Sequence, residues 1–275
     1  MVQNVQSSGS EIGHLCCLGA VCGDVIGSMY EFNSVKSKNF PLFPQGSHPT
    51  DDTMMTVANM LWLTDGGSDS LVECMRQLGA SHPHAGYGGG FRRWLSSPRP
   101  EPYGSYGNGS AMRVSPVAWA ARSLDEALSL ARRSAEVTHN HPEGIKGAQA
   151  TAAATFMALH GATKEAIRQY VETTFGYNLS VPLSDIRPGY RFEVSCQRSV
   201  PEALSCFLES DSYEDAVRNA VSLGGDADTQ AAIAGAVAEA FYGGVPEAIV
   251  QSVWPLLPVD VQQIIIGFSS RLRPC

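Results

Sequence analysis

Two alanine-rich stretches constrain the fold of this chain more than any other part of its sequence. They are IKGAQATAAATFMALHG, residues 145–161, and DADTQAAIAGAVAEAFYGG, residues 226–244, and both end in Gly. Alanine has the highest intrinsic helix propensity, and glycine is the residue that most often ends a helix. Because their side chains are small, such helices can approach their neighbours closely. The two stretches therefore predict closely packed helices.

Helix-start patterns recur elsewhere in the chain. SLDEALSLARRSAEV places Glu126 three residues after Ser123, and SVPEALSCFLES places Glu202 three residues after Ser199. In such a capping box each of the two side chains accepts a hydrogen bond from a backbone N–H group that has no partner within the helix. We therefore predict that one helix begins at Ser123 and another at Ser199.

Two further segments have helical patterns, and strand patterns are rare. SYEDAVRNAVSLGG predicts a helix that starts at Ser212 and stops at Gly224, and VDVQQIIIGFSSRL predicts a last helix over residues 259–272. Only YRFEVSC, residues 190–196, has the alternation that a short strand would need. The sequence therefore predicts an all-α fold.

The composition predicts one globular domain. Hydrophobic residues make up 44% of the 275 residues and charged residues only 17%, which suits a chain with a large core. We expect a single compact domain over residues 1–275, in which residues 1–12 are flexible. The net charge of −8 argues against nucleic-acid binding, because phosphate contacts need clustered Lys and Arg.

Cysteine usage and the absence of apolar runs indicate a soluble protein of a reducing compartment. The chain has seven Cys, of which Cys16 and Cys17 are adjacent, and no C-x-x-C occurs. The start MVQNVQSSGSEIG lacks a basic region followed by an apolar block, so we expect no secretory signal. No apolar run approaches the roughly 18 residues of a membrane span. These features predict a cytoplasmic protein that does not enter membranes.

Two clusters of carboxylate and hydroxyl side chains stand at the starts of predicted helices. Either cluster alone would fit helix capping, because Asp and Thr are favoured at helix N-termini and Asp complements the helix dipole. A cap needs one side chain, however, whereas each cluster offers three oxygen ligands. Oxygen ligands without Cys or His suit Mg²⁺, Mn²⁺ or Ca²⁺ rather than zinc, and four converging carboxylates suit two divalent ions. The six residues are Thr50, Asp51, Asp52, Asp226, Asp228 and Thr229.

Two other acidic motifs fit the second cluster less well. An EF-hand loop needs Asp or Asn at its fifth position and Gly at its sixth, where this chain has Gln230 and Ala231. A phosphohydrolase of the D-x-D-x-T kind would follow an apolar strand, whereas AVSLGG precedes Asp226 and Thr229 comes one position too early. We therefore set both motifs aside.

The segment GAVCGDVIGSMYEF, residues 19–32, carries a glycine every fourth residue. Gly19, Gly23 and Gly27 would share one face of a helix, where another backbone can come close. Asp24 interrupts this apolar segment and identifies it as a helix of a soluble protein. Glu31 ends the segment, and a lone Glu in such a position is most often a solvated surface group.

A glycine-rich loop and a histidine pair offer polar groups to a ligand. Residues 107–110, GNGS, could direct successive N–H groups toward a phosphate, although no G-K-[ST] follows as in a Walker loop. His139 and His141 flank Asn140. Because no Cys or third His stands at a suitable spacing for zinc, hydrogen bonding to a polar ligand or helix capping is the favoured interpretation.

Taken together, these motifs resemble the ADP-ribosylglycohydrolase family, which includes dinitrogenase reductase-activating glycohydrolases and ADP-ribosyl-acceptor hydrolases. The similarity runs in order from about residue 13 to residue 245. It is carried by GDVIGSMYE, TDDT, GNGSAMRV, THNHPEG and GGDADT. Each motif is modest alone, but five in the same order are specific.

The resemblance implies an all-α fold of many crossing helices with a cleft that holds two Mg²⁺ or Mn²⁺ ions. By position, Glu31 would match the mobile acidic residue near the scissile bond in the serine-directed branch, and His139 would match a ribose-contacting histidine. The implied metal ligands are the six residues of the two clusters. Gly107, Asn108, Gly109, Ser110 and Met112 would line the site of the diphosphate and the distal part of the ligand. Candidates for stacking on adenine are Tyr103, Tyr106, Tyr190 and Phe192.

The implied reaction is hydrolysis of the bond between C1″ of the distal ribose and a modified protein group. Asp51, Asp52 and Glu31 are the candidates for acid and base. We predict arginine as the acceptor, with serine or another O-linked group as the alternative. A non-catalytic ADP-ribose-binding protein and a Mg²⁺-dependent nucleotide phosphohydrolase remain as other classes. The expected partners are an ADP-ribosylated protein and ADP-ribose, with no membrane and no specific nucleic acid, and the protein is expected to be a monomer.

Overall fold

The computed structural model describes residues 15–64 and 70–272, and the predicted flexible segment 1–12 lies outside them. Within these ranges the regular structure is helical and no strand forms, which confirms the all-α prediction. The helices are α2 (Gly19–Gly27), α3 (Asp51–Thr64), α4 (Leu71–Ser81), α5 (Gly89–Ser96), α6 (Gly109–Met112), α7 (Ser115–Ala120), α8 (Leu124–Glu136), α9 (Pro142–Leu159), α10 (Lys164–Phe175), α11 (Leu183–Ile186), α12 (Cys196–Leu208), α13 (Tyr213–Leu223), α14 (Ala227–Tyr242), α15 (Glu247–Val253), the 3₁₀ helix η1 (Trp254–Leu256) and α16 (Val259–Leu272).

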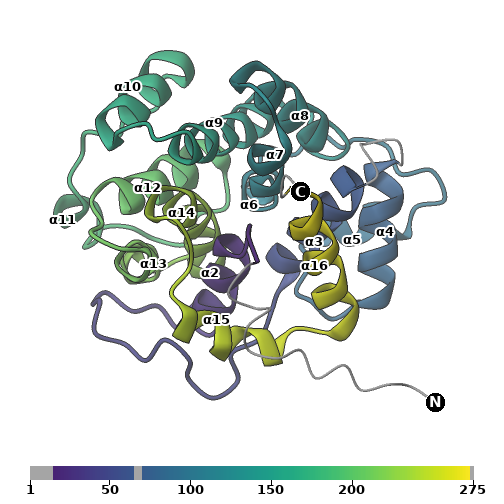
Figure 1. Cartoon of the computed structure of the whole chain (residues 1–275), viewed down its shortest axis with the longest axis horizontal. Helices are drawn as coiled ribbons and strands as arrows, with labels where there is room; N and C mark the ends of the chain where they lie inside the picture. The colour runs from purple at the N-terminus through teal and green to yellow at the C-terminus, as the bar shows by residue number, and fades with distance from the viewer. Residues whose placement is uncertain (1–14, 65–69, 273–275) are drawn as a thin grey trace.

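Helix α14 forms the centre of the fold. Every residue from Ala227 to Ala240 is buried, and α14 packs against α2, α9, α12 and α13. Small side chains allow this burial, because four helices cannot come this close to a helix that carries bulky side chains on all faces. In Figure 1, α2 and α14 lie near the middle, with α3, α4, α5 and α16 on one side and α11, α12 and α13 on the other. The expected close packing of this alanine-rich segment is confirmed.

The glycine face of α2 lies directly against α14. A Cβ atom added at Gly23 would collide with the carbonyl group of Ala231, and one added at Gly27 would collide with the backbone of Asp228. At Gly19 the collision would be with the carbonyl oxygen of Gly235. The predicted shared face is therefore confirmed, and it brings α2 into backbone contact with the first turn of α14.

Two of the predicted helix starts are confirmed. Ser123 Oγ accepts the N–H group of Glu126 at 3.2 Å, although Glu126 reaches back to the N–H group of Arg122 rather than to that of Ser123. Ser212 precedes α13 and accepts the N–H group of Asp215 at 3.1 Å. Gly224 follows the end of that helix with a φ of +72°, as its sequence signal predicted. The last helix also forms as expected, over Val259–Leu272.

The predicted helix start at Ser199 is wrong. Helix α12 begins at Cys196, one turn earlier, and Ser199 lies inside it with its hydroxyl donating to the carbonyl oxygen of Ser195 at 2.8 Å. Cys196 and Val200 are both fully buried, so core packing extends the helix beyond the local signal. Pro201 consequently lies inside the helix.

Residues 190–196, which alone have the alternation of a strand, do not form one, in agreement with the all-α prediction. Ser195 makes only an isolated antiparallel bridge to Gly107. Two hydrogen bonds flank the bridge, from Asn108 N–H to Val194 O at 2.7 Å and from Cys196 N–H to Tyr106 O at 2.9 Å. The pairing stops there because α12 begins directly after Ser195, at Cys196, and α6 begins two residues after Gly107, at Gly109.

In the described part of the chain, no helix combines the length and apolar character needed to cross a membrane.

Candidate active site

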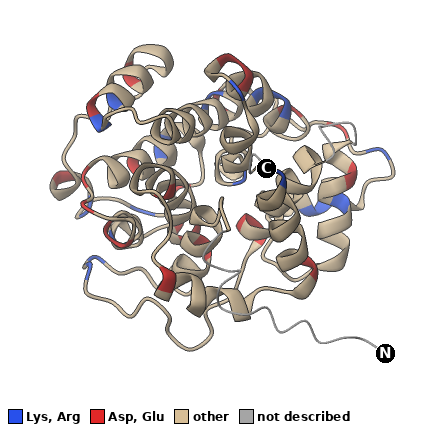
Figure 2. Cartoon of the chain, in the orientation of Figure 1, with Lys and Arg blue, Asp and Glu red and all other residues tan. Residues whose placement is uncertain are grey.

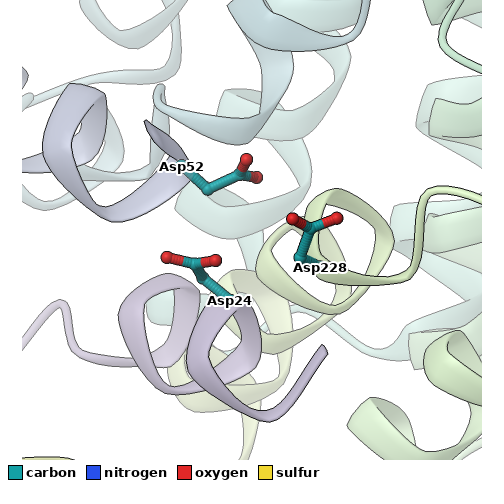
Figure 3. Close-up of side chains that lie close together, drawn as sticks. All are labelled: Asp24, Asp52 and Asp228. Carbon is teal, nitrogen blue, oxygen red and sulfur yellow. The ribbon is translucent and has the colours of Figure 1, made fainter. Parts of the chain in front are cut away.

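Carboxylates from three helices and one loop gather beside the α2–α14 contact. Asp24 comes from the middle of α2, Asp52 from the first turn of α3, Asp226 and Asp228 from the start of α14, and Glu31 from the segment after α2. Carboxylate oxygens of Asp24, Asp52 and Asp228 lie within 4.8 Å of one another, as do those of Glu31, Asp226 and Asp228. Figure 3 shows the first three turned toward a common space, and Figure 2 shows Asp but no Lys or Arg on α2 and the first turn of α3.

A cavity of about 870 Å³ opens at this cluster and brings most of the predicted site residues together. Ser110 is the exception among the predicted ligand-binding residues: it is fully buried and donates to the carbonyl oxygen of Gly144 at 2.7 Å. Of the aromatic candidates, Tyr103 and Phe192 line the cavity, whereas Tyr106 and Tyr190 do not. The predicted residues that line it are Glu31, Thr50, Asp51, Asp52, Gly107, Asn108, Gly109, Met112, His139, Asp226, Asp228 and Thr229.

The carboxylates have polar neighbours but no cationic side chain to neutralise them. Asp226 accepts a hydrogen bond from Asn108 Nδ2 at 2.6 Å, and Asp52 Oδ2 accepts one from Thr229 Oγ1 at 3.2 Å. Asp52 Oδ1 is buried without a partner. No Lys or Arg within residues 15–64 and 70–272 forms an ion pair with any of them. Buried carboxyls of this kind are stable only when a proton neutralises them or a positive charge lies between them.

Burial and mutual repulsion raise the pKa values of the cluster. The pKa of Asp51 rises to about 7, first because of burial and then because of Asp24 and Asp226. The pKa of Glu31 also rises to about 7, through burial and the charges of Asp226 and Asp24. Burial likewise raises the pKa values of Asp52 and Asp228 well above those of free carboxyls. The residues thus fit hard divalent cations, which would replace protons as the counter-charge.

The stabilisation by Mg²⁺ should therefore grow between about pH 5 and pH 8. Because the folded-state pKa values of Glu31 and Asp51 are raised to about 7, the metal-free protein loses stability as the pH rises through that value. Added Mg²⁺ removes this loss by binding the ionised form. Thermal unfolding with and without Mg²⁺ checks this, since other titrating groups contribute equally to both series. A shift in Tm that shrinks with rising pH would contradict it.

Asp24 is a site residue that the sequence analysis missed. It is fully buried, and its carboxylate accepts hydrogen bonds from both the backbone and the hydroxyl groups of Thr50 and Thr53. The sequence signal was present, since Asp24 is the only charged residue in GAVCGDVIG. A charge in an apolar segment indicates a helix of a soluble protein, but a charge on a helix that packs closely against its neighbours also needs a specific partner.

His139 is held in one tautomer by a chain of hydrogen bonds. Arg113 is almost fully buried and donates from Nη2 to Thr138 Oγ1 at 2.9 Å, and Thr138 Oγ1 lies 2.7 Å from His139 Nδ1. The Thr138 hydroxyl accepts from Arg113, and His139 Nδ1 is the only acceptor within hydrogen-bond distance of it among the described residues, so we assign the hydroxyl as donor to Nδ1 and the ring proton to Nε2. Burial, and then the charge of Arg113, hold the pKa of His139 well below its usual value, so the ring is neutral.

The glycine loop is shaped around this histidine. A Cβ atom at Gly109 would lie 3.2 Å from His139 Nε2, and one at Gly107 would lie 3.6 Å from it. His139 therefore presents an N–H donor to the part of the cavity that the loop lines. His141 instead precedes α9 and caps it by accepting the N–H group of Glu143 at 3.1 Å, which is the capping role left open for it.

Comparisons with known proteins agree on one family over most of the chain. The sequence model of the ADP-ribosylglycohydrolase family matches residues 14–264. The ADP-ribosylhydrolase ARH3 of Mus musculus is 30% identical over 326 residues, which cover 90% of this chain and 88% of the mouse protein. ADP-ribosylarginine hydrolase Tri1 of Pseudomonas putida (strain GB-1) is 32% identical over 155 residues, which cover 54% of this chain and 42% of Tri1.

The fold also has a counterpart among solved structures. A chain from a structure described as an ADP-ribosylglycohydrolase-related protein complex matches with a TM-score of 0.70 and 26% identity. The match covers 96% of this chain and 98% of the other. With the family model matched over nearly the whole length, this chain belongs to the ADP-ribosylglycohydrolases, a family of hydrolytic enzymes.

Proposed function

We propose that this enzyme is a metal-dependent hydrolase that removes ADP-ribose from modified proteins by cleaving the bond at C1″ of the distal ribose. The observation that supports it is a cavity of about 870 Å³ with buried carboxylates at one end and the glycine loop and His139 along its wall. The carboxylate end suits divalent cations. The loop end offers neutral N–H donors, which suit a diphosphate or ribose.

Thr50, Asp51, Asp52, Asp226, Asp228 and Thr229 are the residues proposed to hold two Mg²⁺ or Mn²⁺ ions. When bound, such ions would neutralise the cluster, orient the ribose hydroxyls and lower the pKa of the attacking water. Glu31, Asp51 and Asp52 all line the cavity and are the candidates for proton transfer. Their negative charge would also favour the oxocarbenium-like transition state of glycosidic cleavage.

For the acceptor, the position of Glu31 favours serine or another O-linked group. A serine alkoxide is a poor leaving group and needs a proton as the C1″–O bond breaks. Glu31 lies in the cavity beside Asp226 and Asp228, where a protonated carboxyl could supply that proton. Resemblance of Glu31 to the acidic residue of the serine-directed branch points the same way.

Arginine, the acceptor predicted from the sequence, is kept as the second candidate. The similarity to Tri1, an ADP-ribosylarginine hydrolase, supports it over about half of the chain. A cytoplasmic location, a monomeric state and the absence of a nucleic-acid partner remain predictions.

An acceptor panel with wild type and Glu31→Gln tests the proposal. We expect the wild type with Mg²⁺ to release ADP-ribose faster from serine-linked than from arginine-linked protein. Because Glu31 would protonate the leaving group, Glu31→Gln should slow the serine reaction about 10²–10⁴-fold. Calorimetry with ADP-ribose should show that this variant still binds the product.

Each other outcome assigns a different function. Faster release from arginine would support the second acceptor and overturn the role of Glu31. Binding of ADP-ribose without turnover of any linkage would indicate a non-catalytic binding protein. Release of AMP or inorganic phosphate in place of intact ADP-ribose would indicate a nucleotide phosphohydrolase.

A further inference from the structure

Asp24 links helix α2 to the first turn of α3 through both oxygens of its carboxylate. Its Oδ1 accepts the hydroxyl group of Thr50 at 2.7 Å. Its Oδ2 accepts the N–H groups of Thr50 at 2.9 Å and of Thr53 at 3.0 Å, and also the hydroxyl group of Thr53. All of these contacts are buried, and Asp24 itself is 0% exposed. The start of α3 is therefore capped by a residue from another helix.

The hydrogen bond from the Thr50 hydroxyl to Asp24 determines which lone pair of the hydroxyl oxygen remains for a further partner. The hydroxyl has one proton, which it donates to Asp24, and two lone pairs. One lone pair accepts the N–H group of Asp52 at 3.2 Å. The remaining lone pair is left on the cavity side, where Thr50 is one of the lining residues. Because Asp24 accepts the proton of the Thr50 hydroxyl, a lone pair of the Thr50 oxygen is available to bind a cation.

Asp24 lies near enough to the other carboxylates to be mistaken for a ligand. One of its oxygens lies within 4.8 Å of an oxygen of Asp52 and of Asp228, and Figure 3 shows the three side chains together. Both of its oxygens, however, already accept hydrogen bonds, three on Oδ2 and one on Oδ1. Asp52 differs, because its Oδ1 is buried and has no partner. The buried oxygen of this group that has no partner therefore belongs to Asp52, and not to Asp24.

We propose that Asp24 is a positioning residue, which orients Thr50 and the start of α3 toward a divalent cation by accepting hydrogen bonds, without touching the cation itself. The inference rests on the proposed metal site but makes a separate claim about a residue behind it. Hydrogen-bond partners of metal ligands commonly set affinity in this way.

Asp24→Asn tests this role, with Glu239→Gln as a matched control. The amide keeps one acceptor oxygen, so its NH₂ group must face either Thr50 Oγ1 or a backbone N–H group. The control removes a similar buried carboxylate contact at the other end of α2, since Glu239 of α14 accepts the N–H groups of Leu18 at 3.0 Å and Gly19 at 2.6 Å. Both variants should lose stability, but only Asp24 adjoins the site.

The measurement is Mn²⁺ binding to the full metal-stripped chain by calorimetry, without substrate. We expect Asp24→Asn to lower the affinity about 10–100-fold and Glu239→Gln to leave it within about threefold of wild type. Wild-type affinity in Asp24→Asn, or an equal loss in Glu239→Gln, would overturn the positioning role. Asp226→Ala separates the two claims, because unchanged Mn²⁺ binding in that variant would refute the proposed metal site itself.

A second measurement needs no variant and so does not depend on the folding of Asp24→Asn. In a crystal structure of the wild type with Mn²⁺, we expect the Thr50 hydroxyl to bind the ion while it still donates to Asp24. No oxygen of Asp24 should lie at coordination distance. Direct coordination of Mn²⁺ by Asp24, or loss of the Thr50–Asp24 hydrogen bond, would overturn the proposal.

Discussion

Replacing Asp228 with Asn is expected to abolish hydrolysis while making the metal-free protein more stable. Asp228 is almost fully buried in the first turn of α14, and its neighbours Asp226 and Asp52 repel its charge. Burial and this repulsion raise the pKa of Asp228 in the folded protein, so the carboxyl opposes folding at any pH above its unfolded-state pKa. A neutral amide removes this cost. The same change removes a proposed ligand, which should lower turnover about 10³-fold or more.

The matched control is Asp125→Asn. Asp125 also lies in the first turn of a helix, α8, but it is exposed and lies outside the cavity. Its turnover should equal that of the wild type. Release of ADP-ribose from a modified protein gives the first readout, and the Tm of the metal-free chain gives the second. Wild-type turnover in Asp228→Asn, or a Tm below that of the wild type, would contradict the assignment.

Gly23→Ala is expected to cost about 3 kcal/mol or more of the free energy of unfolding. The added methyl group would collide with the backbone of Ala231, and no side chain can rotate away to make room. Helices α2 and α14 would have to separate at their contact. Because domains are stable by only about 5–15 kcal/mol, the variant should show a much lower midpoint in urea and impaired activity.

Gly267→Ala provides the comparison for this variant. Gly267 lies in α16, and a Cβ atom there would meet nothing within 4 Å. Since Ala favours helix over Gly, this change should be neutral or stabilise the protein by up to about 1 kcal/mol. Equal effects of the two substitutions would show that helix propensity, rather than the α2–α14 contact, decides the outcome.

The parts of the fold that could be predicted are those with local signals. The spacing of Gly19, Gly23 and Gly27 defines a helix face whatever its partner is, and that face was found where expected. Ser212 and Gly224 mark a helix because capping depends only on nearby backbone groups. The two oxygen clusters were recognisable because three ligand-type side chains within three or four positions exceed what a cap requires.

The parts that could not be predicted depend on contacts between distant segments. Nothing local distinguishes Ser199 from a real helix start, because the burial of Cys196 and Val200 decides where α12 begins. The partners of Asp24 lie 26 and 29 residues further along the chain. Glu31 alone in its segment is typical of a solvated surface group, and only the resemblance indicated a site role; it is half-buried because the loop after α2 turns it toward Asp226 and Asp228.

The role of His139 shows the same limit. Its position in THNHPEG indicated a polar contact, but its neutral state and its Nε2 proton depend on Arg113 and Thr138. The direction of a hydrogen-bond chain depends on which donors and acceptors surround each group, and only the arrangement in space gives those neighbours. Sequence therefore identified the residue, and the structure identified the atom.

The most direct test of metal-dependent hydrolysis is ADP-ribose release by the metal-stripped wild type, measured before and after Mg²⁺ is restored, on serine- and arginine-linked substrates. We predict that stripping stops release, that Mg²⁺ restores it, and that the product is intact ADP-ribose with a free C1″ hydroxyl. Release that is unaffected by stripping, or no ADP-ribose from either substrate after Mg²⁺ is restored, would contradict the account.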